Sequence, residues 1–185
     1  MYVPSSEQVI ADTRRWLERA VIGLNLCPFA KAVYAKDQVH FAVCPSAEFA
    51  GVLEALDAEL DGLLALAPAV RDTTLLVLPH GFDDFMLFHE LVREGERRIA
   101  RRGLEGTVQL ASFHPQFRFA QAEDDDVGQC SNRSPYPTLH LLREASIDRA
   151  VAAFPDAEAI FGANVETLRR LGHEGWAALD VGRSA

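Results

Sequence analysis

Short strand-like segments alternate with long helix-like segments over the first two thirds of the chain. The strand-like segments are 38–44, 73–78 and 107–113, where apolar residues alternate with polar ones or run without a break. Apolar residues at helical spacing cover 49–64 and run from 85 to about 102. Strands that alternate with helices form βαβ units with parallel strands. The sequence therefore predicts a single α/β domain, in which helices flank a three-stranded, mainly parallel sheet.

Helix signals also stand at both ends of the chain. Ser5 and Gln8 form a capping-box pattern in front of apolar residues at helical spacing, so a first helix is expected to start there. After a stretch without periodicity, the pattern predicts a helix from Thr138 to Glu144 and further helices up to Gly172. These segments are expected to add helices at the C-terminal end of the domain.

The charge and composition disfavour several classes of protein. With 18 basic and 27 acidic residues, the net charge is −9, and an acidic surface disfavours binding to nucleic acid or to anionic membranes. No apolar run approaches the roughly 20 residues that span a bilayer, and the first residues lack the basic and apolar regions of a signal peptide. Three widely spaced cysteines fit a reducing compartment. We therefore expect a cytoplasmic protein without nucleic-acid or membrane partners, of undetermined oligomeric state.

Reactive side chains stand near the end of each predicted strand. Cys44, His80 and His114 each lie beside a proline. In open α/β sheets the ligand crevice lies outside the carboxyl ends of the strands, so we expect these residues at one edge. His80 and His114 are the candidate acid–base pair. They are also candidate ligands for a divalent transition metal, with Cys27, Cys44 or Asp83 as partners from distant segments.

Cys27 has two interpretations. It lies between the first predicted helix and Pro28, a residue that suits the first position of a short helix. A cysteine at a helix N-terminus has a lowered thiol pKa and can act as a nucleophile. Ala30 stands where a dithiol motif has its second cysteine, which excludes local dithiol exchange. The alternative is a small buried apolar residue, since free cysteines are often buried.

A proline-rich segment and the residues after it supply candidate substrate-binding groups. They are Asn132, Arg133, Tyr136, His140 and Arg143. Arginine presents a planar fork that fits a carboxylate or a phosphate. In the predicted helix, His140 and Arg143 are three residues apart and share a face. The group predicts a pocket for a small anionic molecule; the alternative is that the arginines form structural ion pairs.

The long stretch 121–137 shows no helix or strand pattern. It contains four consecutive acidic residues and two prolines. A segment of this length inside a small domain is usually functional or disordered. We expect a flexible or lid-like loop over the strand ends.

Three segments of the chain are distinctive as written, namely 15–30, 111–115 and 132–144. In these segments the chain resembles a bacterial family known as domain of unknown function 1415. The resemblance extends over nearly the whole chain. It implies no particular activity, cofactor or catalytic residue.

Four functions are open at this point. The first is an enzyme that acts on a small anionic substrate by histidine acid–base or metal-assisted chemistry, hydrolase or lyase-like, with Cys27 as ligand or nucleophile. A nucleotide cofactor of the standard kinds is not expected, because neither GxGxxG nor GxxxxGK[ST] occurs. The alternatives are a non-catalytic protein that binds a metal or a metabolite, a thiol-dependent activity at Cys27, and an interaction module without a pocket.

Overall fold

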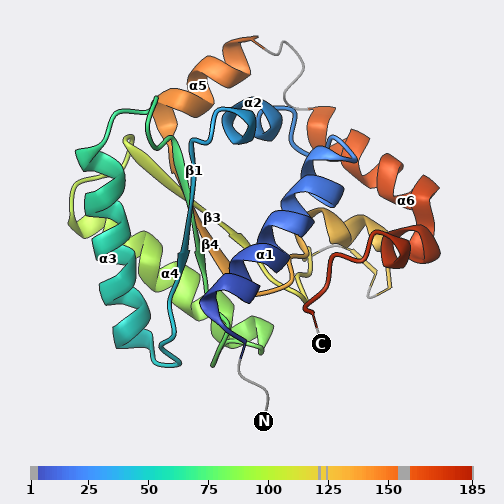
Figure 1. Cartoon of the computed structure of the whole chain (residues 1–185), viewed down its shortest axis with the longest axis horizontal. Coiled ribbons are helices and arrows are strands. Elements are labelled where there is room, and N and C mark those ends of the chain that lie inside the picture. Colours follow the sequence, from blue (N-terminus) through green and yellow to red (C-terminus); the bar gives the residue numbers. More distant parts are fainter. Residues whose placement is uncertain (1–3, 121, 124, 154–158, 185) are drawn as a thin grey trace.

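A mixed sheet with helices on both faces organises the chain (Figure 1). The computed structural model describes residues 4–120, 122, 123, 125–153 and 159–184. Its strands are β1 (Val39–Val43), β2 (Thr73–Val77), β3 (Val108–Phe113) and β4 (Thr138–Arg143). Its helices are α1 (Ser6–Trp16), η1 (Leu17–Ile22), α2 (Ala30–Ala35), α3 (Phe49–Ala65), α4 (Phe85–Arg101), η2 (Val127–Asn132), α5 (Glu144–Ala153) and α6 (Ile160–Ala178).

The order of the strands is β1-β2-β4-β3. β1 and β2 are parallel, whereas β4 is antiparallel to both of its neighbours, β2 and β3. β1, β2 and β3 therefore run in the same direction, and their carboxyl ends lie at one edge. The sequence predicts these three strands correctly, and the mixed α/β class is confirmed.

The prediction of a three-stranded, mainly parallel sheet is wrong, because a fourth strand lies between β2 and β3. Residues 138–143, predicted as a helix, form this strand. Leu139 and Leu141 are fully buried against the layer of α3 and α4, while His140 points to the other face. Leucine favours helices, so this short run is ambiguous from the sequence. Its pairing with β2 on one side and β3 on the other makes it a strand.

The first face of the sheet packs against α3 and α4 (Figure 1). Strand residues Leu76 and Leu141 meet Leu56 and Phe88 in one fully buried cluster. Asp84 fixes the start of α4, since its side chain accepts a hydrogen bond from the backbone N–H of Leu87 at 2.8 Å. This layer is the larger part of the core and leaves the opposite face for other elements.

The second face of the sheet is covered by α1 and by η1, its direct continuation. As the sequence predicts, α1 starts at a cap formed by Ser5, whose hydroxyl accepts a hydrogen bond from the N–H of Gln8 at 3.2 Å. η1 is a turn of π-helix, a rare form that frequently occurs at functional sites. α2 and α5 lie at one end of this face (Figure 1).

The C-terminal part of the chain packs on η2. Val127 and Cys130 of η2 are buried against Leu168 of α6 and against Leu26. The described part of 121–137 is thus packed from Val127 onward, and a lid role for this stretch stays a prediction. α6 is kinked at Gly172, whose φ of 71° is compatible with the helix end predicted there.

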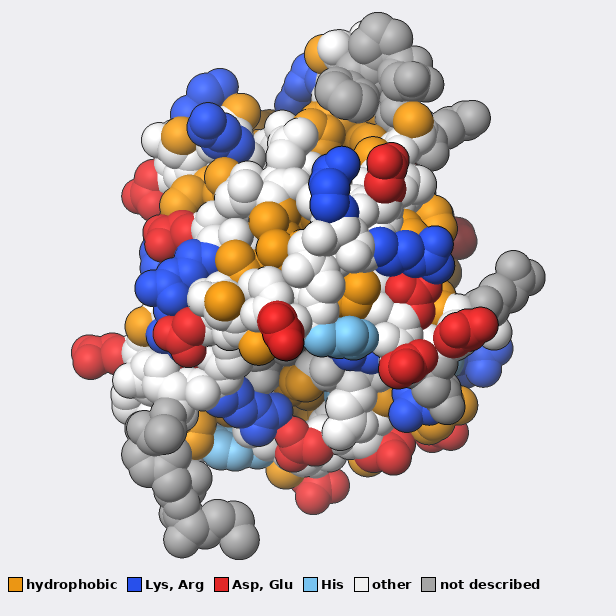
Figure 2. Space-filling view, turned by 90° about the vertical axis from the view of Figure 1, so that its right-hand side faces the viewer, with side chains coloured by type: hydrophobic (Ala, Val, Ile, Leu, Met, Phe, Trp, Pro, Cys, Tyr) orange, Lys and Arg blue, Asp and Glu red, His pale blue; other side chains and the backbone are white. Residues whose placement is uncertain are grey.

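None of the helices in the described residues is long and apolar enough to cross a membrane. On the α6 side of the molecule, acidic and basic side chains are intermixed with small hydrophobic areas (Figure 2).

Candidate functional site

A cavity of about 380 Å³ lies on the second face of the sheet, under η1, α2 and α5. Its walls are mainly apolar and include Leu17 and Val21 of η1, Val33 of α2, Leu75 of β2 and Ile147 of α5. Ligand pockets of small-molecule proteins hold roughly 300–1,000 Å³ and are mostly apolar, with a few convergent polar groups. The cavity has the size and lining of such a pocket.

His140 supplies a polar group in this cavity. In the sheet it lies opposite Leu75 on one side and Ala111 on the other. Its Nε2 is 2.5 Å from the hydroxyl of Thr73, and that hydroxyl donates its proton to the carbonyl of Leu141 at 2.7 Å. Because the one hydroxyl proton of Thr73 is used on Leu141, we assign the ring proton of His140 to Nε2 and the lone pair to Nδ1. Among the described residues Nδ1 has no hydrogen-bond partner, so it is available to a molecule in the cavity.

The imidazole of His140 is neutral at physiological pH. Burial among apolar side chains lowers the pKa of His140 from the ordinary 6.5 to about 4. The ring also contacts the aromatic ring of Phe113, with centroids 5.9 Å apart. The cavity therefore presents a hydrogen-bond acceptor, Nδ1, without a charge.

Cys27 lines the same cavity as His140 and is a half-buried free thiol. The prediction that Cys27 stands directly at a helix N-terminus is wrong, because α2 begins at Ala30 and Phe29 is its N-cap. Cys27 lies in the turn between η1 and α2, where its carbonyl accepts a hydrogen bond from the N–H of Ala30 at 3.2 Å. The structure thus brings together two of the predicted site residues, Cys27 and His140.

Arg143 closes one end of the cavity but faces away from His140. The predicted shared helix face does not exist, because residues three apart in a strand point to opposite sides of the sheet. The guanidinium of Arg143 donates hydrogen bonds to the carbonyls of Leu63, Leu66 and Arg71. Arg143 therefore ties the end of β4 to the loop that follows α3.

The carboxyl edge of the sheet holds His114, which is fully buried. Its Nε2 donates to the carbonyl of Phe82 at 2.9 Å, and its Nδ1 accepts from the N–H of Gln116 at 3.0 Å. Burial lowers the pKa of His114, an effect that the contact with Phe82 opposes. Both nitrogens bind backbone groups, so the neutral ring holds the loop after β2, at Phe82, to the loop after β3, at Gln116. Neither nitrogen is open to a substrate.

The other residues predicted at this edge do not form a group with His114. His80 is half-buried and shares no hydrogen bond or ring contact with His114 within the described residues. Cys44 is buried, with its thiol 3.9 Å from the carbonyl of Gly51. Asp83 is paired with Arg183 at 2.8 Å.

The predicted anion-binding residues before β4 are divided between two places. Arg133 borders a second hollow, of about 540 Å³, at the carboxyl edge, and its Nε donates to the carbonyl of Phe117 at 3.4 Å. The backbone carbonyl of Asn132 accepts a hydrogen bond from the backbone N–H of His114 at 3.1 Å. Tyr136 is buried on the α1 side of the sheet. These residues therefore do not share a pocket with His140.

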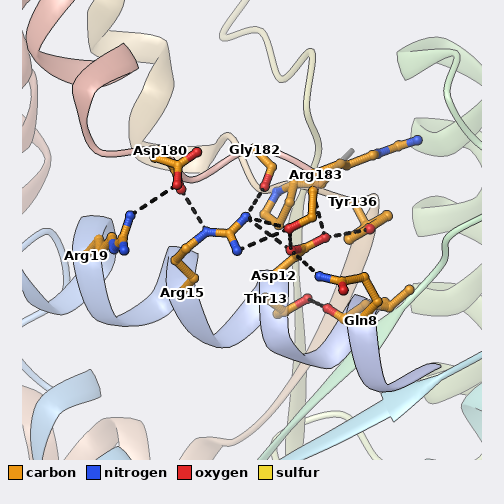
Figure 3. Close-up of polar contacts among 12 residues, drawn as sticks. Gln8, Asp12, Thr13, Arg15, Arg19, Tyr136, Asp180, Gly182 and Arg183 are labelled. Atoms are coloured by element: carbon orange, nitrogen blue, oxygen red, sulfur yellow. Dashed lines mark hydrogen bonds and ion pairs between the residues drawn. The ribbon is translucent and has the colours of Figure 1, made fainter. Parts of the chain in front are cut away.

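Tyr136 takes part in a buried polar network centred on Asp12 of α1 (Figure 3). The fully buried carboxylate of Asp12 accepts hydrogen bonds from the hydroxyl of Tyr136 at 2.9 Å and from the side chain of Gln8 at 3.0 Å. The backbone N–H and hydroxyl of Ser184 bind it at 3.0 and 2.6 Å, and Arg15 lies 3.1 Å away. The network fixes α1, and with it one wall of the cavity, against the sheet.

Burial by itself raises the pKa of Asp12. The hydrogen bonds from Ser184, Tyr136 and Gln8 outweigh this effect and hold the pKa of Asp12 below its ordinary value. Asp12 therefore stays ionised in the native protein, as an anchor for the C-terminal residues.

Sequence reasoning missed Thr73 and Asp12. Thr73 acquires its role only through the register of β2 and β4, which the sequence does not specify. Asp12 does carry a signal, because it lies on the apolar stripe of α1 with Val9, Thr13 and Trp16. A carboxylate on such a stripe must be hydrogen-bonded when it is buried.

Within the described residues, no group of three or more His, Cys, Asp or Glu side chains is arranged to hold a metal ion. A family model with the description "protein of unknown function (DUF1415)" matches residues 8–178 of the chain. No match is found among the curated proteins or among the solved structures.

Proposed function

For this chain, which belongs to the family described as protein of unknown function (DUF1415), we propose a small-molecule-binding function. The ligand is a largely apolar organic molecule that occupies the cavity under η1, α2 and α5. One hydroxyl or N–H group of the ligand donates a hydrogen bond to Nδ1 of His140. The observation that carries the proposal is a neutral imidazole with an unused acceptor in a mainly apolar cavity of about 380 Å³.

The chemistry of the cavity favours this class of ligand. An apolar molecule gains roughly 25 cal/mol for each Å² of apolar surface removed from water. A charged group placed among these apolar walls would lose its hydration. Arg143, the cation in the lining, already donates to the carbonyls of Leu63, Leu66 and Arg71. The hydrogen bond to Nδ1 gives orientation, because it is accepted at a fixed point on the sheet.

Catalysis by Cys27 and His140 is the second candidate function, because the two side chains line one cavity. A thiol needs a base to become a thiolate nucleophile at neutral pH. A general base works best with a pKa near the working pH, and the pKa of His140 is about 4. Binding is therefore the better-supported function. The acid–base pair proposed from the sequence, His80 and His114, lacks a free nitrogen on His114.

A thermal-shift screen with neutral phenols and medium-chain alcohols tests the proposal. A ligand at 100 times its dissociation constant stabilises a protein by about 2.7 kcal/mol, which raises the melting temperature measurably. We expect some of these compounds to stabilise the wild type. Ala111→Leu, which fills the cavity beside His140, should abolish the shift, whereas Ala145→Leu at an exposed position of α5 should retain it. The proposal fails if none of the compounds stabilises the wild type.

A further inference from the structure

We propose that the ligand of the cavity carries a carboxylate at one end, and that Lys36 and Arg149 hold this group outside the cavity. The inference rests on the proposed function and narrows its ligand to an apolar body with an anionic head. The head remains in contact with water, and the body lies in the cavity next to His140.

The cavity is continuous with an outer hollow of about 560 Å³. The two share Phe29, Val33, Asp72, Ser146 and Ala150 as lining residues. A molecule that is too long for the cavity can therefore extend past Ser146 into the outer hollow.

The charge around the outer hollow favours an anion. Its charged lining residues are Lys36 and Arg149, which are exposed, and Asp72. The local charge is thus positive on a chain whose net charge is −9. A positive site on an acidic protein attracts anions selectively.

A hydrogen bond to Ser146 fixes the position of Arg149. The hydroxyl of Ser146 donates to the carboxylate of Asp72 at 2.6 Å and accepts from Nη2 of Arg149 at 2.9 Å. Ser146 belongs to both hollows, so this contact directs the guanidinium to their junction. A guanidinium has five N–H donors, and the hydrogen bond to Ser146 uses one of them. The remaining donors can form the paired hydrogen bonds that arginine makes with a carboxylate.

The orientation of the ligand follows from desolvation. A carboxylate inside the apolar cavity would lose its hydration, and the neutral His140 offers it no charge. At the outer hollow the same group keeps water and gains two cations. An apolar molecule with one terminal carboxylate therefore binds with its chain inward.

8-Hydroxyoctanoate and 1,8-octanediol share a terminal hydroxyl for His140 and differ in the other head group, so the pair tests the inference by isothermal titration calorimetry. We expect 8-hydroxyoctanoate to bind the wild type more tightly than 1,8-octanediol. The double variant Lys36→Glu and Arg149→Glu should weaken 8-hydroxyoctanoate by roughly tenfold, which is about 1.4 kcal/mol for the two exposed ion pairs together. The affinity for 1,8-octanediol should stay the same. Rising salt should reduce the preference for 8-hydroxyoctanoate in the wild type.

Lys31→Glu is the matched control, because Lys31 is an exposed residue of α2 that lines neither hollow. It should leave the ratio of the two affinities unchanged. If 1,8-octanediol binds but 8-hydroxyoctanoate has no advantage, or the double variant keeps the advantage, the inference is overturned and the proposed function stands. If the phenols, the alcohols, 1,8-octanediol and 8-hydroxyoctanoate all fail to bind the wild type, both are overturned.

Discussion

His140, in β4, and His114, directly after the neighbouring strand β3, have different roles because of their partners. His114 gives both nitrogens to backbone groups and holds two loops together. His140 uses one nitrogen on Thr73 and keeps the other for the cavity. The sequence shows that both residues are histidines close to strands. It does not show their hydrogen-bond partners, because these depend on the register of β2 and β4 and on the paths of the loops after β2 and β3. For this reason the sequence names His140 and Cys27 as candidate site residues but does not predict that they line one cavity on the face of the sheet.

The stability of the protein should depend on the protonation of His140. The unfolded imidazole takes up a proton below about pH 6.5, whereas the native one resists protonation down to about pH 4. The free energy of unfolding is therefore unaffected by this titration above pH 6.5, and it falls as the pH drops from 6.5 toward 4, where only the unfolded state binds the proton. The shift in pKa corresponds to roughly 3 kcal/mol.

His140→Gln removes this titration while an amide can still bind Thr73. Urea unfolding at pH 7 and at pH 4.5 should show that the variant loses less stability on acidification than the wild type. Equal losses in the two proteins would mean that His140 is not buried in its neutral form. His114→Gln should lower the stability at both values, since the ring of His114 is a fixed part of the loop structure.

At the scale of elements, what the sequence predicts best is the set of long segments. The strands 39–43, 73–77 and 108–113 and the helices α3 and α4 follow from hydrophobic periodicity over many residues. β4 was missed because six residues rich in leucine fit a helix as well as a strand, and only the neighbouring strands select the extended form. The cavity depends on β4, so its composition was out of reach of the sequence.

The kink of α6 gives a prediction for this element. Gly172 has a φ of 71°, and a methyl group there would meet no atom within 4 Å. With a ψ of 174°, Gly172 lies in a backbone region that is nearly confined to glycine, so Gly172→Ala should destabilise the protein by about 1–3 kcal/mol through backbone strain alone. Gly162 has the same open surroundings but a helical backbone, so Gly162→Ala should stabilise the protein by about 0.5–1 kcal/mol. Thermal unfolding of the two variants measures both effects. If both substitutions shifted the melting temperature in the same direction, the kinked conformation at Gly172 would be contradicted.

At the scale of the whole molecule, the residues after α6 join the two ends of the described chain. Arg15 of α1 donates hydrogen bonds to the carbonyls of Asp180 and Gly182 (Figure 3). Arg19 of η1 donates to the carbonyl of Leu179. Arg183 donates a hydrogen bond to the carbonyl of Pro135 and stacks on the ring of Tyr136. The guanidinium carbon Cζ of Arg183 lies 4.7 Å from the centroid of that ring. These contacts connect α1, the segment before β4 and the C-terminal residues into one structure.

Asp12→Asn tests this connection. The amide cannot accept all the hydrogen bonds that the carboxylate receives, so the variant should be less stable by about 2–3 kcal/mol at neutral pH. The native pKa of Asp12 is lowered, so the wild type loses this stabilisation as the pH falls below about 4, and the variant does not. Asp148→Asn, at an exposed position of α5, is the control and should leave the unfolding midpoint unchanged. A variant at Asp12 with wild-type stability at pH 7 would show that the network is dispensable.

α5 covers the cavity without any fully buried residue of its own. It follows β4 directly, so a change in the backbone angles near Glu144 is enough to move it while the sheet and the α3–α4 layer stay in place. Local opening costs little where few side chains are buried. Ligand exchange would then be fast even for a tightly folded protein, and amide hydrogens of α5 would exchange with deuterium long before those of β4.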